Sequence, residues 1–179
     1  MADAQTGWDI WVLPINGERK PFPFVKTNFD ERGGRFSPDG RWVAYRSNES
    51  GRYEIYVRPF DPADTASADG GSTTSGGQWQ VSAAGGMNPV WSADGTELYY
   101  VAPDAKLMAV PIKTKSTTLE PGTPATLFQT RIVGSGTDAD LGTNYDVTSD
   151  GRSLIDVTTD QSTSAPITVV LNFPILVQK

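Results

Sequence analysis

Short apolar segments separated by turn-forming residues recur along the chain. Three stretches share one layout, at residues 33–47, 87–102 and 143–158. In each stretch a short apolar strand precedes an Asp-Gly pair, and a second apolar strand, alternating with polar residues, follows it. The pairs repeat every 55 to 56 residues, at Asp39-Gly40, Asp94-Gly95 and Asp150-Gly151. This internal repetition predicts an array of similar structural units.

The Asp-Gly pairs have the composition of tight hairpin turns. Glycine adopts the positive φ that such turns require, and the preceding aspartate can bond nearby backbone amides. We therefore interpret Asp39, Asp94 and Asp150 as turn formers, in preference to the alternative that they are catalytic carboxylates.

Each unit contains a third and a fourth predicted strand. The third strands are predicted at residues 54–60, 107–112 and 167–171, with an N-terminal counterpart at 8–15. The fourth, outer strands are predicted at 79–81 and 125–128, with a counterpart at 21–25. Four short antiparallel strands per period are typical of a β-propeller blade. The sequence therefore predicts an all-β propeller fold without sustained helical periodicity.

The predicted strands divide a single domain into successive blades. Residues 1–27 form an incomplete or shared blade, 28–84 a first complete blade with an exposed loop at 62–77, 85–130 a second complete blade, and 131–179 a three-stranded C-terminal blade. This partial propeller has about three blades, whereas closed propellers have four to eight. We expect a two-fold homodimer with a shared blade to close a ring of about six. The alternative is a fragment whose remaining blades belong to a larger protein.

Charge and composition narrow the classes of partner. The net charge is −6, which argues against nucleic acid as a partner because such binding normally needs a basic surface. The chain contains no apolar run long enough to span a membrane. Residues 1–7 lack the features of a signal peptide, so we expect either a cytoplasmic location or an export signal outside this sequence.

The absence of cysteine and histidine restricts the possible chemistry. It excludes disulfides, thiol nucleophiles, triads with an imidazole base, and zinc sites built from these residues. A bound metal would need oxygen ligands, which favours calcium, magnesium or manganese, and we consider a calcium site. The loops that lead into the predicted inner strands carry such ligands, and the candidate residues are Asp30, Glu31, Asn88 and Asn144.

Two functions follow from these observations. The first is a non-catalytic module that binds a protein, a peptide or a small molecule at the channel mouth or on the blade faces, and it requires no cofactor. The second is a calcium-assisted, promiscuous hydrolase of esters, lactones or phosphotriesters, with its site at the channel mouth. We favour the first, because polar residues are common in the loops of any propeller.

The first complete unit, RFSPDGRWVAYRSNESGRYEIYVRPF, resembles the TolB-like propeller repeat. The longer pattern, from GWDIWVLPINGERKPFPF through KLMAVPI to SAPITVVLNF, is similar to the C-terminal propeller of certain bacterial serine/threonine kinases. The second and third units replace Ser-Pro-Asp-Gly by Ser-Ala-Asp-Gly and Thr-Ser-Asp-Gly, so the motif weakens toward the C-terminus. Kinase motifs are absent from the sequence. The resemblance implies a propeller fold and, by analogy, a recognition role outside the cytoplasm.

Overall fold

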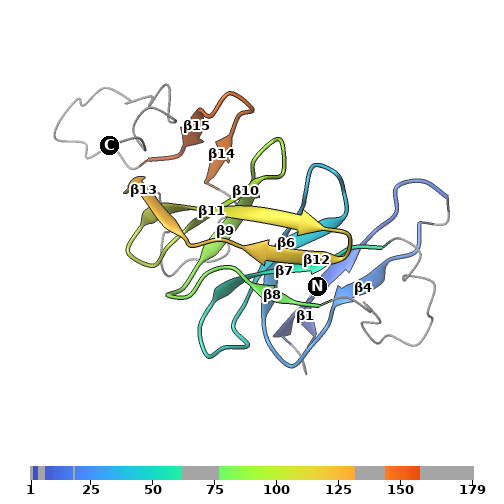
Figure 1. The fold of residues 1–179 in the computed structure, drawn as a ribbon. Helices are drawn as coiled ribbons and strands as arrows, with labels where there is room; N and C mark the ends of the chain where they lie inside the picture. The colour runs from blue at the N-terminus through green and yellow to red at the C-terminus, as the bar shows by residue number, and fades with distance from the viewer. Residues whose placement is uncertain (1, 4–6, 18, 62–76, 132–143, 158–179) are drawn as a thin grey trace.

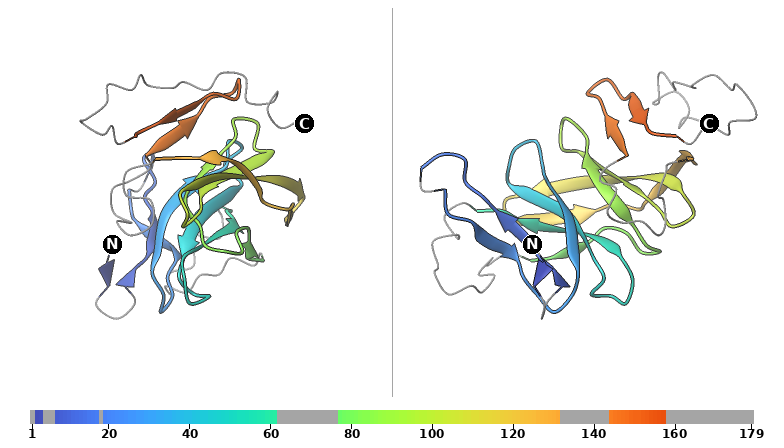
Figure 2. Two further views of the ribbon diagram at one scale, coloured as in Figure 1. Left: turned by 90° about the vertical axis from the view of Figure 1, so that its left-hand side faces the viewer. Right: turned by 180° about the vertical axis from the view of Figure 1, so that it is seen from behind.

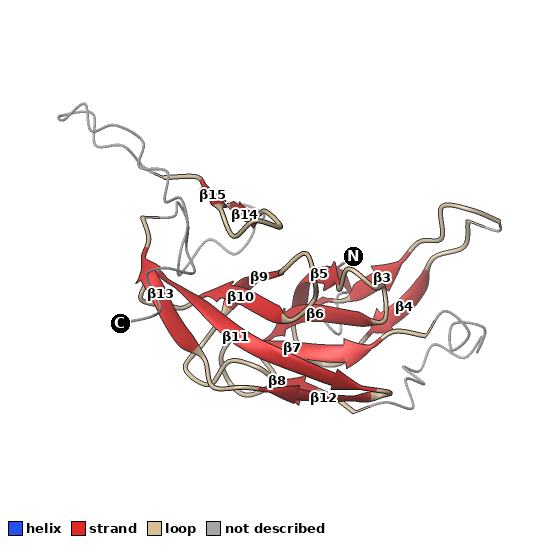
Figure 3. Cartoon of the chain, turned by 45° about the horizontal axis from the view of Figure 1, so that its top comes forward, coloured by secondary structure: helices blue, strands red, loops and turns tan. Residues whose placement is uncertain are grey.

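A computed structural model describes residues 2–3, 7–17, 19–61, 77–131 and 144–157. All regular structure in these residues is β-strand (Figure 3), and the strands form antiparallel sheets. The prediction of an all-β fold built from propeller-type blades is therefore confirmed. In the described residues no helix is long and apolar enough to cross a membrane. The strand predicted at 167–171 and all but the last residue of the loop predicted at 62–77 lie outside the described residues.

The first complete blade is a four-stranded sheet in simple chain order. Its strands are β5 (Glu31–Phe36), β6 (Trp42–Ser47), β7 (Glu54–Pro59) and β8 (Trp79–Gln80). β6 is buried along its whole length, because it lies inside the sheet and both of its faces are covered. This burial on both faces explains the continuous apolar run that the sequence shows between Trp42 and Tyr45.

The second complete blade repeats this order and adds one strand. It contains β9 (Met87–Trp91), β10 (Glu97–Val101), β11 (Lys106–Lys115) and β13 (Ala125–Gln129). The additional strand, β12 (Thr118–Pro121), pairs with the extended end of β11. This hairpin lies over the first blade, and Leu119 of β12 is buried there. The repeat pattern of the sequence does not predict this hairpin.

Two half-blades flank the complete blades. The N-terminal half-blade pairs β3 (Ile10–Val12) with β4 (Phe22–Val25), and the C-terminal half-blade pairs β14 (Tyr145–Val147) with β15 (Ser153–Ile155). A short additional pair, β1 (Ala2–Asp3) and β2 (Gly7–Trp8), precedes β3. The half-blades lie at opposite ends of the row of sheets (Figures 1 and 2).

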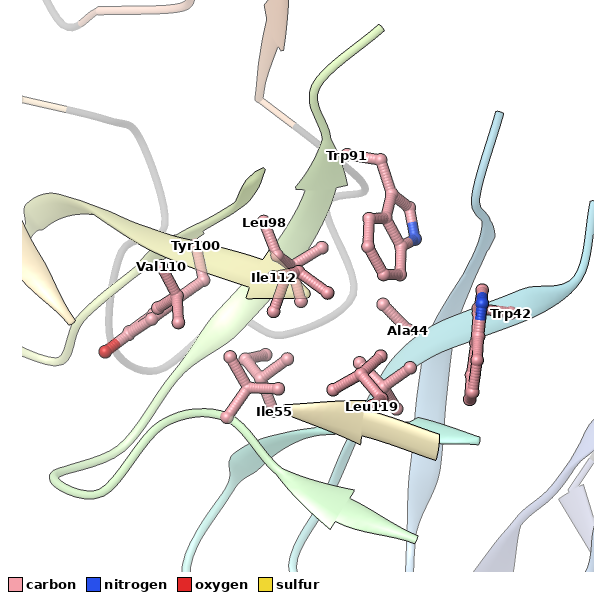
Figure 4. Close-up of a cluster of buried hydrophobic side chains, with 11 residues drawn as sticks. Trp42, Ala44, Ile55, Trp91, Leu98, Tyr100, Val110, Ile112 and Leu119 are labelled. Carbon is pink, nitrogen blue, oxygen red and sulfur yellow. The ribbon is translucent and has the colours of Figure 1, made fainter. Parts of the chain in front are cut away.

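Three apolar clusters join the successive sheets. The largest lies between the two complete blades, where Trp42 and Ala44 of the first blade meet Trp91, Leu98 and other residues of the second (Figure 4). The second cluster joins the opposite face of the first blade to the N-terminal half-blade. The third joins the second blade to the C-terminal half-blade. Because side chains alternate between the faces of a strand, each complete blade contributes to two of these clusters.

Candidate functional site

The three Asp-Gly pairs lie in hairpin turns. Gly40, Gly95 and Gly151 have φ values of 71°, 72° and 81°. In the first turn the Ser37 hydroxyl donates a 2.6 Å hydrogen bond to Asp39, and this carboxylate also accepts from the Arg41 amide. Asp94 accepts in the same way from the Ser92 hydroxyl and the Thr96 amide. Each of these two carboxylates therefore holds the backbone of its own turn.

The third turn is one residue tighter than the other two. In the first blade the Ser37 hydroxyl accepts a hydrogen bond from the amide of Trp42, five residues later. In the C-terminal half-blade the Thr148 hydroxyl accepts from Arg152, only four residues later. The Arg152 guanidinium also donates a hydrogen bond to the Asp150 carboxylate. This bond, together with one from the Thr148 hydroxyl, lowers the pKa of Asp150 to about 2. Arg152 thus occupies the position of Trp42, one residue earlier than the sequence repeat suggests.

Asp30, the first candidate metal ligand, is held by charged and polar neighbours. Its two carboxylate oxygens accept hydrogen bonds of 2.7 Å from the Arg32 guanidinium, and one of them also accepts from the Tyr53 hydroxyl. The Arg32 hydrogen bond is the main cause that holds the Asp30 pKa below its ordinary value. Burial, together with the Asp30 bond, raises the pKa of Tyr53. Asp30 and Arg32 therefore form a structural ion pair.

Glu31, the second candidate, is buried at the start of β5 with 1% of its surface exposed. One carboxylate oxygen accepts a hydrogen bond from the Thr27 hydroxyl and a longer one, of 3.4 Å, from Ser47. The other oxygen has no hydrogen-bond partner among the described residues. Burial raises the pKa of Glu31, and the nearby carboxylate of Asp9 raises it further. The side chain is therefore enclosed by polar neighbours, Thr27 and Ser47.

The two candidate asparagines lie in the second complete blade and at the start of the C-terminal half-blade. The backbone carbonyl of Asn88 accepts a 2.7 Å hydrogen bond from the hydroxyl of Tyr145, the residue after Asn144. The carbonyl of Asn144 accepts from the amide of Asp156, which closes the C-terminal half-blade. Asn88 and Asn144 are thus linked through Tyr145, while the contacts given above for Asp30 and Glu31 lie within the first blade and its entry loop. Within the described ranges no group of three or more acidic side chains is placed to hold a metal ion.

A polar network that was not predicted from the sequence surrounds Glu54. This carboxylate is fully buried in β7, and it accepts hydrogen bonds from Arg52, from the Ser82 hydroxyl and from the amide of Gly85. A Cβ added at Gly86 would lie 2.7 Å from Ile55, so glycine is needed there for packing. The sequence signal was an acidic residue at the start of an apolar strand, followed 31 residues later by a Gly-Gly pair. The network fixes the connection between the two complete blades.

The large apolar side chains that remain exposed lie mainly on the two half-blades. We call Trp11, Leu13 and Ile15 the N-terminal end face; their exposed fractions are 36%, 56% and 76%. We call Leu154, which is 74% exposed, the C-terminal end face. In the described part of the chain the row of sheets stops at these end faces, so their apolar side chains lack the neighbouring blade that covers their counterparts inside the row.

Comparisons with known proteins find solved structures of similar fold, but no matching sequence family. No family model matches the chain, and no curated protein matches it. A putative TolB from Agrobacterium tumefaciens matches with 18% identity and a TM-score of 0.44, over 66% of this chain and 42% of the other. TolB from Acinetobacter baumannii matches with 14% identity and a TM-score of 0.43, over 89% of this chain and 45% of the other. The chain thus spans less than half the length of either TolB protein.

Proposed function

We propose that this protein is a non-catalytic interaction module that associates through the two ends of its row of blades. The single observation that carries the proposal is the exposure of large apolar side chains on both end faces. Leu13, Ile15 and Leu154 are each more than half exposed, although side chains of this kind are core residues inside the row. Apolar groups that gather in this way mark surfaces at which proteins associate.

The partner that we propose is a second copy of the same chain, which would close a ring of about six blades. Propeller blades stack their apolar faces on one another, so an end face is best covered by another blade. A small molecule or a peptide would then bind at the mouth of the completed channel. The similarity to the C-terminal propeller of bacterial kinases remains a prediction from the sequence alone.

No described contact favours the hydrolase alternative. Both oxygens of Asp30 accept hydrogen bonds from Arg32, and Glu31 is buried beside Thr27 and Ser47. A carboxylate engaged by a guanidinium has little remaining capacity to bind calcium, because the two cations compete for the same oxygens. We therefore do not propose a catalytic site.

Light scattering coupled to size-exclusion chromatography tests the proposal. We expect a particle with about twice the 19.3 kDa mass of the chain, which dissociates on dilution. Leu13→Arg and Leu154→Arg each place a charge on an end face, and we expect each to weaken association about tenfold or more. Thr114→Arg, on the exposed part of β11, is the matched control and should leave the mass unchanged. A monomer at all concentrations would contradict the proposal.

A further inference from the structure

The two half-blades contain complementary strands of one blade. In the complete blades the first two strands flank the Asp-Gly turn, and the third and fourth follow. β14 and β15 flank Asp150-Gly151, so they are a first and a second strand. β3 pairs with β4 as β7 pairs with β8, so these are a third and a fourth strand. Within the described residues, the edge of β15 opposite β14 and the edge of β3 opposite β4 pair with no other strand.

We infer that β15 of one copy pairs with β3 of a second copy, and that the two half-blades join into one four-stranded blade. This inference rests on the association proposed above and adds the edges and the register through which it occurs. Each chain then contributes two complete blades and one half at each end. Two copies close the ring with two identical shared blades. In this geometry the C-terminal end of each copy binds the N-terminal end of the other, and the ring is complete with two copies.

The faces of the two half-blades agree with this pairing. Ile10 and Val12 of β3 pack against the first blade, so the alternating Trp11 and Leu13 point away from it. Ile155 of β15 packs against the second blade, so Leu154 points away from that blade. In the shared blade, Leu154 would lie on the same face as Val12, and Ile155 on the same face as Trp11.

The complete blades supply the register. Pro59 lies opposite Trp42 in the first blade, and Pro111 lies opposite Glu97 in the second. Pro14 is the corresponding proline of the N-terminal half-blade, and Arg152 is the residue that occupies the position of Trp42. Aligning Pro14 with Arg152 places Leu154 opposite Val12, as Ala44 lies opposite Val57. This register agrees with the face assignment, whereas a shift by one residue would place paired side chains on opposite faces.

The pairing covers the apolar groups that are exposed at the ends. Between the complete blades, Ala44 and Trp91 belong to one buried cluster. Leu154 corresponds to Ala44. Phe36 corresponds to Trp91, because each lies three residues before the aspartate of its Asp-Gly pair. Phe36 is 51% exposed. Leu154 of one copy would therefore cover Phe36 of the other. Trp11, Leu13 and Ile15 would pack against the second blade of the copy that supplies β15.

The charges of the two half-blades are also complementary. Residues 7–27 contain three cationic and two acidic side chains, whereas residues 144–157 contain one cationic and three acidic side chains. The N-terminal half-blade is thus net positive and the C-terminal half-blade net negative. Opposite net charge favours their encounter and disfavours pairing of two identical ends.

Engineered cysteines test the register directly, because the natural chain contains no cysteine. In the first blade the Phe60 amide donates a hydrogen bond to the Arg41 carbonyl, so these two residues form a hydrogen-bonded pair. Hydrogen-bonded and non-hydrogen-bonded pairs alternate along an antiparallel ladder, and Ala44 and Val57, three pairs further on, are therefore a non-hydrogen-bonded pair. The corresponding pair is Leu154 and Val12, whose side chains would lie close enough for a disulfide. We expect the double variant Val12→Cys/Leu154→Cys to form a covalent dimer under mild oxidation, seen on a denaturing gel without reductant.

Two controls isolate the predicted contact. Leu13→Cys/Leu154→Cys moves one cysteine by a single residue to the opposite face of the sheet, so we expect little cross-linking. A mixture of the Val12→Cys and Leu154→Cys single variants should cross-link, whereas either variant alone should not, because the disulfide joins different copies.

The outcomes separate this inference from the proposed function. A dimer by light scattering that cross-links equally in both double variants, or in neither, would overturn the β15–β3 pairing and leave the association intact. Such a result is expected if the strand predicted at residues 167–171 occupies the edge of β15 within its own chain. A monomer by light scattering would overturn the association itself, and the inference with it.

Discussion

The indole Nε1 of Trp91 donates a 3.2 Å hydrogen bond to the backbone carbonyl of Arg35, and this bond links the inner strands of the two complete blades. Trp91 is also part of the buried cluster between these blades. Replacing Trp91 by phenylalanine removes the donor and part of the ring. We expect Trp91→Phe to lower the free energy of unfolding by about 2 kcal/mol, measured by denaturant titration.

Trp42→Phe is the matched control for Trp91→Phe. Trp42 belongs to the same cluster, but its buried indole nitrogen has no hydrogen-bond partner among the described residues. Its replacement by phenylalanine loses a similar ring area and relieves an unsatisfied donor, so we expect a smaller loss of stability. Equal losses for the two variants would show that the bond between Trp91 and Arg35 contributes nothing.

Replacing Gly86 by alanine tests the packing of the connection between the complete blades. The added Cβ would lie 2.7 Å from Ile55 and 2.9 Å from the Ser82 hydroxyl, so both neighbours must move. We expect Gly86→Ala to cost about 2–4 kcal/mol, measured by thermal or chemical unfolding. Gly51→Ala is a useful comparison, because Gly51 has a φ of +89° but open space around it. We expect it to cost only the backbone strain of about 1 kcal/mol, and an equal or larger cost would contradict the packing argument.

Leu119 tests whether the β11–β12 hairpin holds the first blade. This side chain is 1% exposed in the cluster between the complete blades, and Arg41 of the first blade bonds the carbonyl of Ser116 in the hairpin. We expect Leu119→Ala to lower the free energy of unfolding by about 2–4 kcal/mol. Glu120→Ala, at the exposed neighbouring position, should change it little. Similar effects of the two substitutions would mean that the hairpin does not pack as described.

Glu31 should make stability depend on pH. Its raised pKa means that the folded protein holds the proton more tightly than the unfolded chain, in which the pKa is near 4.5. The stability is therefore greatest below this value, and it falls as the pH rises through the higher pKa of the folded protein. We expect Glu31→Gln to raise the free energy of unfolding by about 1–2 kcal/mol at pH 7. The gain should shrink at pH 4, where the natural glutamate is protonated.

Glu120→Gln serves as the control for Glu31→Gln, since Glu120 is exposed on β12. It should leave the free energy of unfolding unchanged at both pH values. If Glu31→Gln destabilises the protein equally at pH 7 and pH 4, the Glu31 carboxylate is not a buried charge that opposes folding.

The strand pattern of the complete blades was predictable because each strand carries a strong local signal. The Asp-Gly pairs fix the turns, and the apolar run from Trp42 to Tyr45 reports burial on both faces. The same logic located β3 and β4, where Pro21 and Pro23 accompany an outer strand. These features depend on near neighbours in the chain, so a repeat in the sequence is enough to find them.

Other features depend on contacts that the sequence does not report. β12 contains a single large apolar residue, and only the fold shows that this residue, Leu119, reaches the first blade. Asp30 and Glu31 look like ligands in the sequence, yet one is paired with Arg32 and the other is buried beside Thr27. The tighter turn at Asp150 shifts the following strand by one residue, so Leu154 takes the position of Ala44 instead of the position of Val43 that the sequence repeat suggests.

A crystal structure of the particle that forms in solution would test the central claim most directly. We predict two chains in a closed ring of about six blades, with β15 of each chain hydrogen-bonded to β3 of the other and Leu154 opposite Val12. A single chain with both end faces in contact with solvent, or two chains joined through any other surface, would contradict it.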